Sequence, residues 1–398
     1  MRVTNFRKTV SQKITIYKAD FIFDNNDLNG VVVFKVPASY GNPNFYYDPF
    51  FVAAAPMAMA LEENLNFEGD VSAKLSANIY AIKKHINQAF SRIKIRTRKV
   101  VTYKKNGHEN GLFFTLGVDS FHSLLCSSKK ISKLVFVHGF LSYKVSKSVK
   151  KEVEEKIRKV AKSTKTEAVF IETNLRDIAD KIISWDYYHG AAIAASALFL
   201  TSKISRMYIS NCEEYLIDKP WGTKKELDHL WSTDRMSFES IFPYKIRMEK
   251  AIDLVKNSRS LPLLKNLWVC YRHISDTRIE NCSNCAKCMR TYLCFLAAGM
   301  KEPIPGFKKL NPRWLYQMEI KFPEYKKWER ILNSLIKKRL GNEAIYQGIR
   351  DVIRRKKKFA FAKWRQQTSE SFKSLIKKIL KRTPLSSLYT DLRYIFAK

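Results

Sequence analysis

The stretch on which the predicted fold depends is Leu112-Phe113-Phe114-Thr115-Leu116-Gly117-Val118-Asp119-Ser120. It begins with a short apolar run typical of a buried strand. Gly117 then interrupts the run, and a helical pattern follows from Ser120 to Leu125. The sequence therefore predicts a strand, a tight turn and a helix in direct succession.

Apolar runs and longer helical patterns alternate beyond this stretch. Strand-like runs occur at 134–137, 168–171 and 207–209, and helical patterns occupy residues 145–162 and 187–201. Strands that alternate with helices of ten or more residues favour a doubly wound, mostly parallel α/β sheet. Ligands of such sheets bind beyond the carboxyl ends of the strands.

Three regions of the chain differ in composition. Residues 1–105 contain short alternating runs and one helical stretch, which predict a small α+β domain. Residues 106–300 carry the α/β pattern. Residues 301–398 are basic and helical, and within them 331–398 holds 18 Lys and Arg against 4 Asp and Glu. We therefore expect two domains followed by a basic helical region.

The whole chain has 398 residues and a formal charge of +35. Such a surface attracts polyanions such as nucleic acid, nucleotides or anionic lipid, although a generally basic proteome would produce the same bias. Gly (13) and Pro (12) are scarce and 45% of the residues are hydrophobic, which excludes collagen-like and wholly disordered proteins.

Two features favour a cytoplasmic protein. No apolar stretch reaches the about 20 residues that a membrane-spanning helix needs; the stretch from Ala191 to Leu200, for example, has ten. Residues 1–12 are polar and basic, without the apolar segment of a secretory signal.

The turn around Gly117 has the composition of an anion-binding loop. A strand that leads directly into a helix points free backbone N–H groups at an anion. The hydroxyls of Thr115 and Ser120 can donate to phosphate oxygens, and Asp119 suits a Mg²⁺ ion that bridges carboxylate and phosphate. On these six residues alone, an ordinary turn with Asp119 favoured by the helix dipole is the better interpretation.

The cysteines form a second motif. Cys282, Cys285 and Cys288 have the spacing C-x2-C-x2-C, and Cys270 lies twelve residues before them. Four thiolates suit a tetrahedral Zn²⁺ ion in a closed, structural site. An iron–sulfur cluster uses the same ligands and is an alternative, as are scattered buried thiols. Three further cysteines are expected in the core: Cys126, Cys212 and Cys294.

The loop also resembles the SGGxDS motif of the PP-loop ATP pyrophosphatases, of the adenine nucleotide alpha-hydrolase-like superfamily. Thr115 replaces the Ser and keeps its hydroxyl, and Leu116 replaces the first Gly, which costs energy if its φ is positive. The combination of this loop with the four cysteines resembles that of the 7-cyano-7-deazaguanine synthases. The resemblance covers roughly residues 110–300 and is to a divergent bacterial branch of that superfamily.

The resemblance implies an HUP-like fold and an enzyme that splits ATP into AMP and pyrophosphate. Such an enzyme adenylates a carboxylate or carbonyl oxygen, and a nitrogen nucleophile then displaces AMP. ATP, Mg²⁺ and Zn²⁺ are the implied cofactors, and the acid or carbonyl substrate is unidentified. Asp119 and Ser120 are the expected catalytic residues, while the whole segment 115–120, Val118 included, is the expected phosphate loop.

Two residues outside the loop complete the expected nucleotide site. Arg176 follows a strand end, where a nucleotide would lie, and a surface arginine is the alternative. His189 precedes the apolar helix expected from Ala191, whose N-terminus could hold pyrophosphate; a structural histidine is the alternative.

The basic region after residue 301 suits an RNA backbone, an anionic membrane surface or an acidic protein, or else a solvated helical tail. Arg354 to Lys358 and Lys377 to Arg382 contribute much of its charge. It motivates a second hypothesis, a catalytically impaired nucleotide-fold module that binds nucleic acid or another polyanion. Transfer RNA thiolation ranks last, because the clustered cysteines are committed to metal.

Overall fold

The computed structural model describes residues 1–41, 46–86, 93–141, 145–211, 221–270, 279–301, 304–318, 320 and 324–355. The chain divides into two compact units, Met1–Lys309 and Leu310–Lys398. Among the described residues, no helix combines the length and the apolar character needed to cross a membrane.

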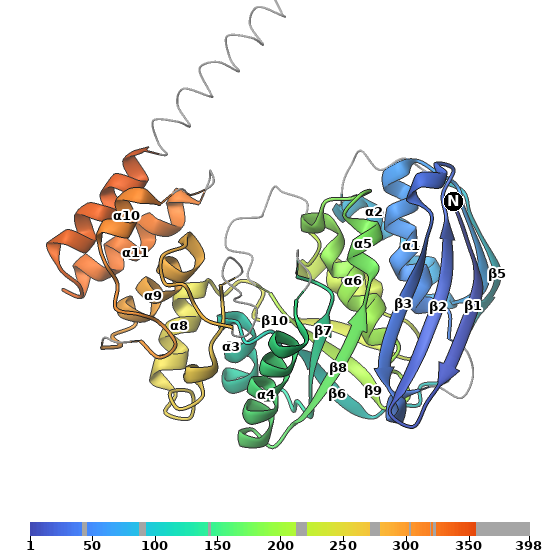
Figure 1. The fold of residues 1–398 in the computed structure, drawn as a ribbon, viewed down its shortest axis with the longest axis horizontal. Helices are drawn as coiled ribbons and strands as arrows, with labels where there is room; N and C mark the ends of the chain where they lie inside the picture. The colour runs from blue at the N-terminus through green and yellow to red at the C-terminus, as the bar shows by residue number, and fades with distance from the viewer. Residues whose placement is uncertain are drawn as a thin grey trace, which may run out of the picture. The chain divides into compact units, whose positions relative to one another are not determined.

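One sheet of ten strands runs through the first unit (Figure 1), in the order β10-β9-β6-β7-β8-β3-β2-β1-β4-β5. Six strand pairings are parallel, and three, β1–β2, β2–β3 and β3–β8, are antiparallel. The predicted α/β class with a mostly parallel sheet is therefore confirmed. The strands are β1 (Arg2–Val10), β2 (Ile14–Ile22), β3 (Gly30–Pro37), β4 (Leu65–Ser72), β5 (Ile95–Val101), β6 (Glu109–Phe113), β7 (Lys133–His138), β8 (Glu167–Thr173), β9 (Ile204–Ser210) and β10 (Ser237–Ile241).

The described helices of both units have the following bounds. They are α1 (Asp48–Leu61), α2 (Ala73–Ile86), α3 (Val118–Cys126), α4 (Lys147–Ser163), α5 (Leu175–Ala179), α6 (Trp185–Leu198), α7 (Lys225–Asp228), α8 (Arg247–Lys256), α9 (Ala286–Ala297), α10 (Arg313–Gln317) and α11 (Tyr325–Lys337). Short 3-10 turns lie at η1 (Asn26–Leu28), η2 (Ala38–Tyr40), η3 (His229–Trp231) and η4 (Leu264–Asn266).

The five strands β6 to β10 form the doubly wound half. The chain passes from β6 outward to β7 and β8, and then returns to the other side of β6 to add β9 and β10. The order reverses between β6 and β9, and ligands of open α/β sheets bind at such a switch point, beyond the carboxyl ends of the strands. The loop that follows β6, residues 114–117, lies at this point.

Helices cover both faces of this half. Alternate residues of a strand face opposite sides, so Val135 and Val137 of β7 join the core that includes α1 and α6. Phe170 of β8 instead faces α4, where the guanidinium of Arg158 lies 4.6 Å from its ring centroid. A sheet covered on both faces explains why its central strands read as continuous apolar runs.

The first 105 residues extend the same sheet. Strand β3 pairs with β8, with Phe34 opposite Thr173 and Lys35 opposite Glu172. The boundary predicted near residue 105 falls between β5 and β6, but the hydrogen-bonded sheet continues across it. This pairing covers the edge of β8, which would otherwise expose unpaired backbone groups.

The second unit is helical in its described part. Helix α11 buries Trp328, Ile331, Leu332 and Leu335, which recur at helical spacing. Residues 343–355 form another helix. The basic runs beyond Arg355, including Lys356 to Lys358 and Lys377 to Arg382, lie outside the described residues.

Candidate functional site

The loop between β6 and α3 is closed by its own hydrogen bonds. The Ser120 hydroxyl donates to the Gly117 carbonyl (3.0 Å) and accepts from the Thr115 amide (3.3 Å). Ser120 is buried, with 3% of its surface exposed. Its hydroxyl therefore shapes the turn, so a phosphate contact of the predicted kind would compete with these two bonds.

Leu116 is the residue of this loop with an unusual backbone conformation. Its φ is +59°, in the left-handed region that disfavours side chains with a Cβ. Gly117 has an ordinary extended conformation with φ −82°, so the position that suits glycine is 116 and not 117. The Leu116 side chain is fully buried, and its carbonyl accepts a hydrogen bond from the Trp268 amide at 2.9 Å.

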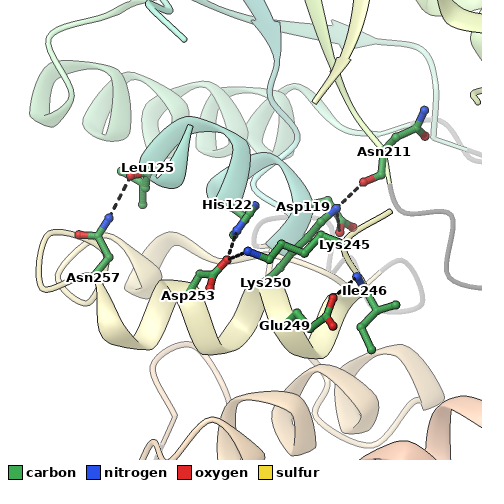
Figure 2. Close-up of polar contacts among 10 residues, drawn as sticks. All are labelled: Asp119, His122, Leu125, Asn211, Lys245, Ile246, Glu249, Lys250, Asp253 and Asn257. Atoms are coloured by element: carbon green, nitrogen blue, oxygen red, sulfur yellow. Dashed lines mark hydrogen bonds and ion pairs between the residues drawn. The ribbon is translucent and has the colours of Figure 1, made fainter. Parts of the chain in front are cut away.

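Asp119 lies between two cations of α8. Its carboxylate accepts from Arg247 Nη2 at 2.7 Å and from Lys250 Nζ at 3.1 Å. The Lys250 side chain is fully buried and also donates to the Asn211 carbonyl, at the end of β9 (Figure 2). Burial alone would raise the pKa of Asp119, but Arg247 and Lys250 lower it well below its usual value. Asp119 is thus ionised and joins the two strand ends at the switch point.

Further cations lie beside this pair. Helix α9 packs against α8 and carries Lys287 and Arg290. Burial, with repulsion from Arg247 and Arg290, lowers the pKa of Lys287 to about 8. Positive charge gathered at the end of a doubly wound sheet attracts an anion, and no side chain caps the N-terminus of α3. The arrangement can bind a phosphate or another oxyanion.

A second polar contact between α3 and α8 was not anticipated. His122 Nε2 lies 2.7 Å from Asp253 Oδ2, and Lys245 also donates to Asp253 (Figure 2). Burial lowers the pKa of His122 despite the nearby carboxylate. Asn257 donates to the Leu125 carbonyl at 2.9 Å. In the sequence, this contact could have been inferred from the polar residues at 247, 250, 253 and 257, whose spacing places them on one face of a helix.

Arg176 and His189 are occupied elsewhere. Arg176 forms an ion pair with Asp180 (2.8 Å), donates to the Phe140 carbonyl and lies 4.4 Å from the Trp185 ring centroid. His189 contacts the Trp185 carbonyl through Nδ1 (2.9 Å) and Thr223 Oγ1 through Nε2 (3.1 Å).

The expected start of the His189 helix was wrong. Helix α6 begins at Trp185, so His189 lies in its second turn and not before its N-terminus. Burial lowers the pKa of His189, which favours the neutral ring. Neither Arg176 nor His189 contacts the loop in these interactions, and both contribute to packing at the α5–α6 end of the sheet.

The four predicted cysteine ligands come together. The sulfur atoms of Cys270, Cys282, Cys285 and Cys288 all lie within 4.8 Å of one another, and all but Cys282 are buried. The Cys282 and Cys288 sulfurs are 3.9 Å apart, close to the roughly 3.8 Å expected around a tetrahedral zinc with Zn–S bonds of about 2.3 Å. The four thiolates could therefore hold a metal ion such as zinc.

The turn at these cysteines is already arranged for ligation. The Cys285 amide donates to the Cys282 sulfur (3.3 Å), and the Cys288 amide donates to the Cys285 sulfur (3.4 Å). A cluster of several irons would spread its thiolates farther than one ion does, so this spacing favours a single ion. Cys126 is only partly buried and Cys294 is buried in α9, whereas Cys212 lies outside the described residues.

Comparisons with known proteins identify no family for this chain. No protein-family model matches the chain, and neither the curated proteins nor the solved structures give a match. The resemblance to the PP-loop enzymes therefore depends on the loop and cysteine residues alone, and membership of that family stays a prediction.

We expect Asp119→Asn to lower the free energy of unfolding at pH 7 by roughly 1.5–3 kcal/mol, because it weakens two charge-assisted hydrogen bonds. The pKa of Asp119 is lowered by folding, so its contribution is complete above its ordinary value near 3.8 and is lost as the pH falls further. Urea unfolding at pH 7 and below pH 4 measures both effects. Asp27→Asn, at an exposed site, is the control; a pH-independent difference would contradict the prediction.

We expect Leu116→Gly to destabilise the protein, although glycine suits a positive φ. Loss of the buried leucine side chain lowers the free energy of unfolding by about 2–5 kcal/mol. Relief of the left-handed backbone strain raises it by only about 1–2 kcal/mol. Leu116→Ala keeps the Cβ and should be less stable than Leu116→Gly by about 1 kcal/mol. Denaturant unfolding of both variants checks the order, and a more stable alanine variant would refute it.

We expect one zinc ion per chain, lost in Cys285→Ser together with a lower melting temperature, because the metal adds to folding stability. Elemental analysis of purified protein and thermal unfolding provide the measurements. Cys294→Ser is the matched control, since this cysteine is buried in α9, the helix that Cys285 caps, and is not among the four ligands. Retention of full zinc by Cys285→Ser would argue against the site.

Proposed function

We propose that this protein is an ATP-dependent adenylating enzyme that activates a carboxylate or carbonyl oxygen for attack by a nitrogen nucleophile. The observation that carries the proposal is the cation pair Arg247 and Lys250, held by Asp119 at the switch point of a doubly wound sheet. Phosphate groups of nucleotides bind at this position in doubly wound folds, at the N-terminus of the helix that follows the strand.

The residues have the following roles in the proposed reaction. The N-terminus of α3 and the two α8 cations hold the β- and γ-phosphates. Asp119 would be the ligand of a Mg²⁺ ion, and such an ion would supply further charge neutralisation. An oxygen of the substrate attacks the α-phosphorus, and the bond to pyrophosphate breaks. The nitrogen nucleophile then displaces AMP. Catalysis comes mainly from positioning and from neutralising the charge of pyrophosphate.

The cysteine centre has no chemical step in this proposal. Four thiolates complete a tetrahedral shell and leave no position for water, so a zinc ion there is structural. The substrate is an acid or carbonyl compound, such as a deazapurine, a sugar acid or a protein terminus.

We expect calorimetric titration with α,β-methylene ATP to show binding that requires Mg²⁺. Arg247→Gln should raise the dissociation constant roughly tenfold to a hundredfold, because it removes a charge-assisted contact to phosphate. Lys245→Gln is the matched control, since Lys245 pairs with Asp253 and not with Asp119. Wild-type protein that fails to bind the analogue, or equal binding by Arg247→Gln, would refute the proposal; pyrophosphate release with a panel of carboxylic acids then identifies the substrate.

A second function is favoured by two features of the loop. The Leu116 backbone is left-handed without a glycine, and the Ser120 hydroxyl is occupied within the turn. Both suit a nucleotide fold that no longer turns over and binds nucleic acid or another polyanion through its +35 charge. RNA binding that falls steeply with salt and is unaffected by Arg247→Gln, with no nucleotide binding, distinguishes this alternative.

A further inference from the structure

The phosphate loop is bonded directly to the cysteine segment. The Trp268 amide donates to the Leu116 carbonyl at 2.9 Å, and Trp268 lies two residues before Cys270. Leu116 is the residue with the left-handed backbone, which costs about 1–2 kcal/mol without a glycine. A strained residue keeps its conformation only where its surroundings fix it, and Trp268 is part of those surroundings.

Asn281 joins the two halves of the cysteine site. Its Oδ1 accepts from the amides of Val269 (2.9 Å) and Cys270 (3.3 Å), and its Nδ2 donates to the Leu267 carbonyl (2.8 Å). Nδ2 also donates to the Gly306 carbonyl at 3.0 Å. Asn281 is buried and immediately precedes Cys282, so one side chain binds the segment 267–270 to the turn that carries the other three cysteines.

The metal-binding turn also starts α9. Cys285 is the N-cap of this helix, and Lys287 in its first turn lies close enough to Arg247 for their charges to repel. The position of the turn therefore affects both the backbone of the loop and one cation beside it. A metal ion bound by Cys270 and by the turn would hold both segments at their present separation.

We propose that Asn281 is a positioning residue that couples metal occupancy of the four-cysteine site to the conformation of the phosphate loop. Metal binding fixes Cys270 against Cys282, Cys285 and Cys288, Asn281 transmits this to Trp268, and Trp268 holds Leu116. The coupling of metal to loop stands by itself; its effect on ligand affinity rests on the proposed function.

Hydrogen exchange measured by mass spectrometry tests the coupling without any ligand. Zinc-loaded protein should protect the peptide covering residues 112–121, and removal of zinc by a chelator should speed its exchange roughly tenfold. The peptide covering α1, which packs with α6 on the opposite face of the sheet, should keep its rate. Unchanged exchange of the loop, while residues 281–288 exchange faster, would overturn the proposal.

If the zinc-free protein unfolds, a variant that keeps its zinc tests the same coupling. Asn281→Ala retains all four cysteines and should retain one zinc per chain, yet its loop should exchange roughly tenfold faster than in wild type. Asn257→Ala is the matched control, since Asn257 also bonds its side chain to a backbone carbonyl, that of Leu125, but is bonded to none of the segment 267–270 or the four clustered cysteines. A zinc-loaded Asn281→Ala protein with a fully protected loop would refute the role of Asn281.

Binding of tripolyphosphate gives a separate readout of the functional consequence. If the loop binds phosphate, Asn281→Ala should weaken tripolyphosphate binding roughly tenfold at full zinc content, whereas Asn257→Ala should not. If wild-type protein binds no tripolyphosphate, the proposed nucleotide function fails, and the exchange experiment still decides whether metal and loop are coupled.

Discussion

The ion pairs between Asp119 and the two cations of α8 determine the arrangement of this end of the molecule. Lys250 is fully buried, and a buried ammonium without a countercharge is strongly destabilising. Asp119 supplies that charge, and the Asn211 carbonyl supplies a further acceptor. The first turn of α3, the start of α8 and the end of β9 are thereby fixed together. The same contact places the excess positive charge next to the loop, so stability and the candidate anion site have a common origin.

Local patterns in the sequence predicted the parts of the structure that depend on local chemistry. The strand, turn and helix at 112–125 form as expected, because an apolar run, a glycine and a helical period are all local signals. Three of the four predicted cysteines meet because the C-x2-C-x2-C spacing itself makes a tight turn, and Cys270, also predicted from the sequence, joins them in the folded chain. The continuity of the sheet through β3 and β8 was missed, since strand pairing between distant segments leaves no periodic signal.

The surroundings of the predicted site residues depend on long-range contacts. His189 has no free nitrogen for a phosphate because Thr223, 34 residues later, occupies its Nε2. The contact of Asp119 with Arg247, 128 residues farther along the chain, is visible only in the fold, and the binding of Mg²⁺ by Asp119 stays a prediction. The stripe on α8 was visible as helical spacing, but nothing in the sequence indicates which helix it faces. Burial, and with it the pKa of Lys287, likewise follows from tertiary packing.

The buried leucine at position 116 has a wider consequence for how such proteins are detected. A left-handed loop is usually identified by its glycines, because glycine adopts that conformation at little cost. Here the side chain is anchored in the core and the backbone is fixed by a distant segment, so the same geometry exists under a different residue. A motif search that demands glycine at this position would therefore pass over this chain, although the backbone of the turn after β6 has the left-handed conformation.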